Sequence, residues 1–195
     1  MRIEAVPLVD ARVRLEPLDE GLREPLRAAI DGDFDSWSIM VTNGFGDAFD
    51  AWFDQRVAHM ASGGGPAWAV RRVADGRIVG TSSLHDPVPA HRRVELGSTV
   101  YAPEARGTAV NPACKRLLLG HAFDSGAIRV EIITDALNLR SQAAIARLGA
   151  VREATLRRHK ITWTGRVRDT VMFAITDEDW PGVRDRLDAR LAAFD

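Results

Sequence analysis

The chain has 195 residues, of which 46% are hydrophobic and 27% charged, and its formal net charge is -1. This balance is typical of a globular protein that can bury its own core, and it argues against nucleic acid or an anionic membrane as the main partner. The single cysteine, Cys114, excludes a disulfide framework within the chain, and no signal-peptide core or ~18-residue apolar span is found, so we expect a cytoplasmic protein.

The pattern of apolar residues predicts strands and helices along the whole chain. In chain order we expect a strand over 12–18, helices over 19–30 and 47–61, strands over 68–73, 78–84 and 94–101, a helix over 112–124, a strand over 128–134, a helix over 138–148, strands over 151–161 and 167–175, and a helix over 177–193. Asp19 and Asp47 are the expected caps of the first two helices. The Asp75-Gly76 pair predicts a hairpin turn. This order predicts a mixed α/β (α+β) fold with one central sheet, in a single domain spanning residues 1–195.

The segment 103–112 is the most informative part of the chain, because it joins a predicted strand to a predicted helix. Residues 107–109 are small, so the backbone can approach a ligand closely. Asn111 is expected to cap the helix and Pro112 to begin it. Arg106 adds a positive charge. Because a helix N-terminus presents unpaired N–H groups and the positive end of a dipole, the segment predicts a pyrophosphate site.

Two other phosphate-binding motifs are absent from this segment. A nucleoside-triphosphate loop requires G-x-x-x-x-G-K-[ST] and a dinucleotide site requires G-x-G-x-x-G at a helix start, and the chain has neither. A plain glycine turn before a capped helix stays open as an alternative.

Residues 106–111 resemble the [QR]-x-x-G-x-[GA] loop of the GNAT superfamily of acetyltransferases, and the chain as a whole resembles the RimJ/RimL-type branch. The resemblance covers about residues 11–190 and includes these motifs: Glu95-Leu96-Gly97, Arg106-Gly107-Thr108, Val110-Asn111-Pro112, Asn138 with Arg140-Ser141, Arg147-Leu148-Gly149-Ala150 and Arg168-Asp169-Thr170. The chain departs from the usual loop at Ala109, where glycine is common, and at Asn111. Alanine suits the loop if its φ is negative.

The resemblance implies a GNAT-like, mostly antiparallel central sheet of about seven strands, flanked by helices, with a V-shaped opening between the middle strands. It also implies acetyl-CoA as co-substrate, with the pantetheine arm inserted in that opening. The residues implied to bind it are Thr99, Val100, Tyr101, Arg106, Gly107, Thr108, Ala109, Val110, Asn111, Asn138 and Ser141. The metal-ligand spacings C-x-x-C and H-E-x-x-H are absent, so no metal is expected.

Acetyl transfer to an amine requires a base for one proton and a hydrogen-bond donor for the developing negative charge. By resemblance, Ser141 lies near the thioester sulfur, where its hydroxyl can donate a proton or a hydrogen bond to the leaving thiolate. Glu95 is the preferred base because it opens the strand that leads to the thioester, while His85 and Glu104 are weaker candidates. Structural roles stay open for both preferred residues. Ser141 can simply belong to the first turn of the helix that Asn138 caps, and Glu95 can be an ordinary carboxylate at the edge of the sheet.

The predicted function is therefore that of an acetyl-CoA-dependent N-acetyltransferase that acts directly on a primary amine, of a protein N-terminus or of a small molecule. A catalytically inactive CoA-binding sensor or interaction module is the alternative. Cys114 is expected to be a small buried residue. Trp37, Phe45 and Trp52 line the acceptor entrance or belong to the core, and the basic run 157–160 is a solvated edge or attracts an acidic acceptor. A homodimer is compatible with the chain.

Overall fold

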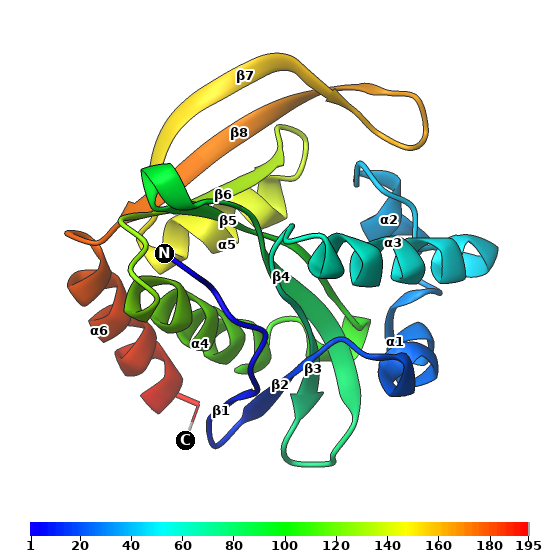
Figure 1. The fold of residues 1–195 in the computed structure, drawn as a ribbon, viewed down its shortest axis with the longest axis horizontal. Coiled ribbons are helices and arrows are strands. Elements are labelled where there is room, and N and C mark those ends of the chain that lie inside the picture. The colour runs from blue at the N-terminus through cyan, green and yellow to red at the C-terminus, as the bar shows by residue number, and fades with distance from the viewer. Residues whose placement is uncertain (195) are drawn as a thin grey trace.

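The computed structural model describes residues 1–194, and its centre is one eight-stranded sheet (Figure 1). The strands are β1 (Leu8–Val9), β2 (Val13–Pro17), β3 (Ala67–Arg72), β4 (Ile78–Val88), β5 (Arg93–Tyr101), β6 (Arg129–Asp135), β7 (Val151–Ile161) and β8 (Val167–Thr176). They lie in the order β1-β2-β3-β4-β5-β6-β8-β7, and only β5 and β6 are parallel neighbours. The expected mixed, mostly antiparallel sheet is thus confirmed, and the two-residue β1 is the strand beyond the seven expected.

Helices cover both faces of the sheet. They are α1 (Arg23–Ile30), α2 (Phe34–Ser38), α3 (Phe49–Ala61), α4 (Val110–Asp124), α5 (Leu139–Leu148) and α6 (Trp180–Ala192). The short α2 lies in a segment for which the sequence predicted no regular element. Asp19 is the N-cap residue of a 3-10 turn, Glu20–Leu22, that leads into α1, but its side chain makes no capping hydrogen bond. The expected cap Asp47 is wrong, because it lies inside the 3-10 turn Gly46–Ala48 and Ala48 precedes α3. Helix α6 starts later than expected, because Thr176 and Asp179 first form a hydrogen-bonded turn.

Two apolar cores lie on opposite faces of the sheet. Residues of α4, α5 and α6, such as Leu118 and Leu187, form one core, and α1, α2 and α3 form the other (Figure 1). Trp37 and Trp52 are buried in the second core, and their rings meet edge to face. Trp37 also donates a hydrogen bond of 2.7 Å from Nε1 to the carbonyl of Ile30. Their burial confirms the core interpretation of these two aromatic residues.

The sheet opens in its middle. Strands β5 and β6 pair through only three residue pairs, from Arg93 with Arg129 to Glu95 with Glu131, and then separate. On its other edge β5 stays paired with β4 up to Tyr101, although a register shift interrupts the ladder where Ser98 adopts a φ of 48°. The backbone edge of β5 beyond Glu95 therefore faces an opening, as the sequence resemblance implied.

Candidate active site

A cavity of about 590 Å³ occupies this opening and continues onto the face covered by α3. One arm of the cavity is bordered by the loop before α4 and by the first turn of α5. The other arm is bordered by α3 and by residues of β4, β5 and β8. We call these the donor arm and the acceptor arm. The open edge of β5 joins them, so two ligands that entered from opposite arms would meet beside this strand.

The loop at the donor arm turns into α4 earlier than the sequence predicted. Ala109 is the residue before the helix, with φ of -65° and ψ of -14°, so Asn111 is not the cap but lies within the first turn. The Oγ1 atom of Thr108 donates to the carbonyl of Ala105 at 2.7 Å and accepts the N–H of Val110 at 3.3 Å, which fixes this earlier start. The negative φ of Ala109 also means that alanine replaces glycine there without strain.

Backbone N–H groups of this loop are available to a ligand. Within residues 1–194, the amides of Gly107, Thr108 and Ala109 donate no hydrogen bond. Gly107 has a φ of 75°, a left-handed conformation that glycine adopts without the cost other residues incur. Gly107 and Thr108 both line the cavity. Three free amides beside a helix N-terminus suit the oxygens of a pyrophosphate.

Arg106 lines the cavity, and partners within the chain hold its positive charge in place. Its guanidinium forms an ion pair with Asp33 and hydrogen bonds to Ser36 Oγ at 3.0 Å and to the Tyr101 carbonyl at 2.7 Å. Burial acts to raise the pKa of Asp33, but hydrogen bonds from Ser36 and Arg106 hold that pKa below its usual value. Arg106 thus ties the loop to the start of α2.

The first turn of α5 also borders the donor arm. Asn138 caps this helix, and its Oδ1 accepts the N–H of Ser141 at 2.9 Å, so the capping role of Asn138 is confirmed. The Ser141 side chain is half-buried and lines the cavity. Its hydroxyl makes no hydrogen bond to any described residue, which leaves it free to donate to a ligand in the cavity.

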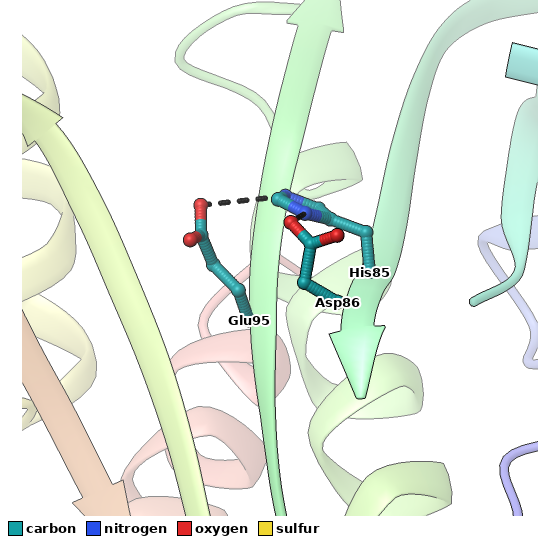
Figure 2. Close-up of side chains that lie close together, drawn as sticks. All are labelled: His85, Asp86 and Glu95. Atoms are coloured by element: carbon teal, nitrogen blue, oxygen red, sulfur yellow. Dashed lines mark hydrogen bonds and ion pairs between the residues drawn. The ribbon is translucent and has the colours of Figure 1, made fainter. Parts of the chain in front are cut away.

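On the acceptor arm, Glu95 lies in a chain of titratable groups (Figure 2). Its Oε1 is 3.3 Å from Nε2 of His85, the residue directly opposite on β4, and His85 Nδ1 is 2.8 Å from Asp86 Oδ2. Figure 2 shows the imidazole ring between the two carboxylates. The second Asp86 oxygen lies 3.3 Å from His59 Nε2. Although burial acts to raise the pKa of Asp86, the hydrogen bond from His85 and nearby positive charges keep it lowered.

This cluster brings together the preferred base and one weaker candidate. The other candidate, Glu104, lies elsewhere and pairs with Arg77 at 3.5 Å. Sequence reasoning missed Asp86, for which the only signal was its place next to His85. The Nε2 atom of His85 is buried and has no aligned hydrogen bond, so its approach to Glu95 at 3.3 Å is a close electrostatic contact.

The same trio is where a metal ion would find ligands. His85, Asp86 and Glu95 place one candidate ligand atom each within 4.8 Å of one another. A mixed nitrogen and oxygen donor set of this kind suits several divalent metals. The hydrogen bond between His85 and Asp86 accounts for the same clustering without an ion.

Lys115 is a further buried group that sequence reasoning did not single out. It points from α4 to the paired strands β4 and β5, where its Nζ is 2.8 Å from Thr99 Oγ1 and 3.2 Å from Ser82 Oγ. Burial lowers its pKa to about 8. The neighbouring Cys114 is fully buried, which confirms its interpretation as a small core residue, and burial raises the pKa of its thiol. The signal in the sequence was a lysine directly after the small apolar residues Ala113 and Cys114.

The remaining candidates divide between the surface and the cavity. Of the basic run 157–160, the first three residues are exposed, and only Lys160 lines the cavity. Trp52 lines the acceptor arm while belonging to the core. None of the helices within residues 1–194 has both the length and the apolar character needed to cross a membrane.

Comparison with known proteins identifies relatives of this fold. A family model described as an acetyltransferase (GNAT) domain matches residues 12–151. No curated protein matches the chain. A T. thermophilus structure assigned as an acetyltransferase is 32% identical, with a TM-score of 0.86 over 98% of this chain and 100% of that chain. A GCN5-related N-acetyltransferase from Brucella melitensis is 27% identical, with a TM-score of 0.87 over 96% and 86%. Mycobacterium smegmatis RimJ in complex with CoA-disulfide shares the fold at 23% identity, with a TM-score of 0.79 over 95% and 93%.

Proposed function

Because the chain belongs to the acetyltransferase (GNAT) family, we propose that it transfers an acetyl group from acetyl-CoA directly to a primary amine, of a protein N-terminus or of a small molecule. One observation carries the proposal: the same cavity has free amides suited to a pyrophosphate on one arm and a carboxylate–imidazole chain on the other. The open edge of β5 lies between these two features.

The donor arm suits CoA along its length. The pyrophosphate accepts hydrogen bonds from the amides of residues 107–109 and benefits from the positive end of the α4 dipole. The pantetheine arm lies along the unpaired edge of β5, where backbone groups of residues 99–101 pair with it as they would with another strand. This arrangement brings the thioester near Ser141, at the first turn of α5.

The reaction then needs few protein groups. Glu95, supported by His85, accepts a proton from the amine, whose nitrogen attacks the carbonyl carbon of the thioester. Backbone N–H groups of β5 donate to the oxygen on which negative charge develops. The carbon–sulfur bond breaks as the Ser141 hydroxyl donates a hydrogen bond to the departing thiolate. Glu95 releases to solvent the proton that it took from the amine, the thiolate takes up one proton from solvent, and the products are an amide and free CoA. We favour direct transfer, because Cys114 is buried in the core and contacts no histidine among residues 1–194 that could activate it.

The decisive experiment measures thiol release from acetyl-CoA with a panel of amines, together with mass spectrometry of the acetylated products. We expect turnover with at least one class of primary amine. If the protein binds CoA but releases no thiol above the rate of buffer with any amine, the proposal fails, and the alternative of an inactive CoA-binding sensor or interaction module takes its place.

A further inference from the structure

Arg168 is a buried arginine without a hydrogen-bond partner. It lies on β8, its side chain is 8% exposed, and it lines the cavity. Within residues 1–194 its guanidinium makes no hydrogen bond, and its Nε is fully buried. The nearest carboxylate oxygen, Asp135 Oδ2, is 3.9 Å from Nε, which is too long for a hydrogen bond. Asp135 is already engaged, since it pairs with Arg166 and accepts the N–H of Leu137.

Such a group is costly unless a partner reaches it. Burial lowers the pKa of Arg168, yet a guanidinium stays charged at every physiological pH. Buried charges in proteins are normally paired and hydrogen-bonded, because an unsatisfied one keeps the full cost of its desolvation. An arginine whose donors are unused and which borders a cavity therefore indicates an anionic ligand that supplies the missing acceptors.

Arg56 offers a second cation in the same arm. It projects from α3, lines the cavity and donates from Nη2 to Ser83 Oγ at 2.5 Å. No described carboxylate lies within ion-pair distance of it, so its charge has no close partner. Burial lowers the pKa of Arg56, and the charges of Asp86 and Glu95, which line the same cavity, oppose that effect.

The two arginines accompany the proposed base. Glu95, Arg56 and Arg168 all line the same cavity, so it holds a carboxylate for an amine and two guanidinium groups for an anion. Arg168 alternates along β8 with the core residues Val171 and Phe173, which pack with α4. Strand alternation thus directs Arg168 to the other face of the sheet, away from the pyrophosphate loop at the start of α4.

We propose that the acceptor is a zwitterion, an amine that also carries a carboxylate, and that Arg168 and Arg56 bind the carboxylate while the amine faces Glu95. This rests on the proposed acetyl transfer. The planar fork of a guanidinium matches a carboxylate through two parallel hydrogen bonds, whereas a neutral carboxamide cannot accept both. The carboxylate belongs either to a free amino acid or to an acidic residue near a peptide N-terminus.

The test compares each amine with a neutral twin. Free amino acids are paired with their carboxamides, and peptides with aspartate at the second position are paired with the asparagine peptides. We expect kcat/KM for the carboxylate member of at least one series to exceed its twin by roughly 10- to 100-fold, as for a hydrogen bond to a charged group. The series that shows the preference identifies the source of the carboxylate. Equal rates for both members in every series would overturn the proposal.

Variants assign the preference to the arginines. Arg168→Gln should reduce the carboxylate preference, the ratio of kcat/KM for the carboxylate member to that for its neutral twin, by at least tenfold, while the affinity for CoA stays within about twofold. Arg56→Gln should act in the same direction. Arg152→Gln is the matched control, because Arg152 is exposed on β7 and bonds only Thr155. A preference that survives in both Arg168→Gln and Arg56→Gln would contradict the assignment.

Two further measurements test the anion site if the variant fails to fold or if no amine is acetylated. If Arg168→Gln fails to fold, as judged by circular dichroism, Arg168→Lys keeps the charge but loses the fork, and the preference should still fall. If no amine is acetylated at all, calorimetry on the CoA-loaded protein compares binding of each carboxylate and its twin. Tighter binding of the carboxylate, lost in Arg168→Gln, would support the anion site although acetyl transfer had failed, and equal binding would reject the site.

Discussion

The Nζ atom of Lys115 lies 2.8 Å from Oγ1 of Thr99, which links the buried face of α4 to the strand that borders the opening. Ser82 Oγ completes the cluster and lies 2.7 Å from the same Thr99 oxygen. No described carboxylate pairs with this amine, so the folded protein carries the cost of burying its charge. Two hydroxyl groups compensate part of this cost, and they also satisfy one another.

Replacement of this amine should change how stability depends on pH. With a pKa of about 8 in the folded chain against an ordinary value of 10.5, Lys115 is still protonated in the unfolded chain when the folded chain has lost its proton. The free energy of unfolding of the wild type should therefore rise between pH 8 and 10.5, relative to Lys115→Met, by an amount on the order of a few kcal/mol. Below pH 8 the difference should be constant, with the wild type at a disadvantage from the buried charge.

Urea denaturation of both proteins at pH 7 and pH 10 measures this effect as a double difference, in which the other titrating groups cancel. If the free energy of unfolding differs between wild type and variant by the same amount at both pH values, Lys115 does not titrate in this range.

Gly107→Val should weaken the binding of CoA. The φ of 75° makes any β-branched residue strained at this position, by about 1–2 kcal/mol, and the side chain would stand over the free amides of the loop. Space is not the obstacle, because an added Cβ meets nothing within 4 Å. We expect the Kd for CoA to rise at least tenfold in calorimetry.

Gly76→Val provides the control for strain alone. Gly76 has a φ of 70°, and an added Cβ there also meets nothing within 4 Å, but it lies in the hairpin turn between β3 and β4. Both variants should lose a similar amount of thermal stability, while only Gly107→Val loses affinity. Equal CoA affinities in the two variants would exclude the loop as the pyrophosphate site.

Ser141→Ala should lower kcat by roughly 10- to 100-fold and leave the Kd for CoA within about twofold, because the hydroxyl acts on the leaving thiolate and not on the bound ground state. Asn138→Ala is the comparison: it removes the helix cap and should cost about 1 kcal/mol of stability. Wild-type turnover in Ser141→Ala would rule out the hydrogen-bond-donor role.

Glu95→Gln should reduce kcat/KM by roughly 100-fold at neutral pH, since a general base contributes at least that much. The deficit should shrink as the pH rises past the pKa of the acceptor amine, because the substrate is then neutral without help. His85→Gln should show a smaller loss of roughly tenfold, as expected for a positioning residue 3.3 Å from the carboxylate. If the loss in His85→Gln exceeds that in Glu95→Gln, the imidazole is the base and the roles are reversed.

Local sequence patterns predicted most of the fold. In runs such as 94–101 and 128–134, apolar residues alternate with polar ones or follow one another, because helices cover at least one face of each strand. This signal lies within the strand itself. The caps were less predictable. Asp19, Asp47 and Asn111 are all good capping residue types, but 3-10 turns and the Thr108 hydroxyl start these helices in another way.

The candidate site likewise combines local features, which the sequence predicted, with contacts that it did not predict. The small residues 107–109 and the Asn138 cap are local features, and the sequence predicted both. The contact between His85 and Glu95 depends on the register of two strands. Arg168 lacks a hydrogen-bond partner because its neighbour Arg166 pairs with the nearest carboxylate, that of Asp135. Relations of that kind arise only when the chain is folded, so no single residue indicated them.

The three residue pairs that join β5 to β6 have a consequence for how the protein survives in a cell. Part of the ladder between two halves of the sheet is left for a molecule from outside the chain to complete. The proposed donor would act as a removable strand, and binding to the folded state alone raises the apparent stability with ligand concentration. The stability of the protein would then follow the combined supply of CoA and acetyl-CoA, because both carry the pyrophosphate and the pantetheine arm.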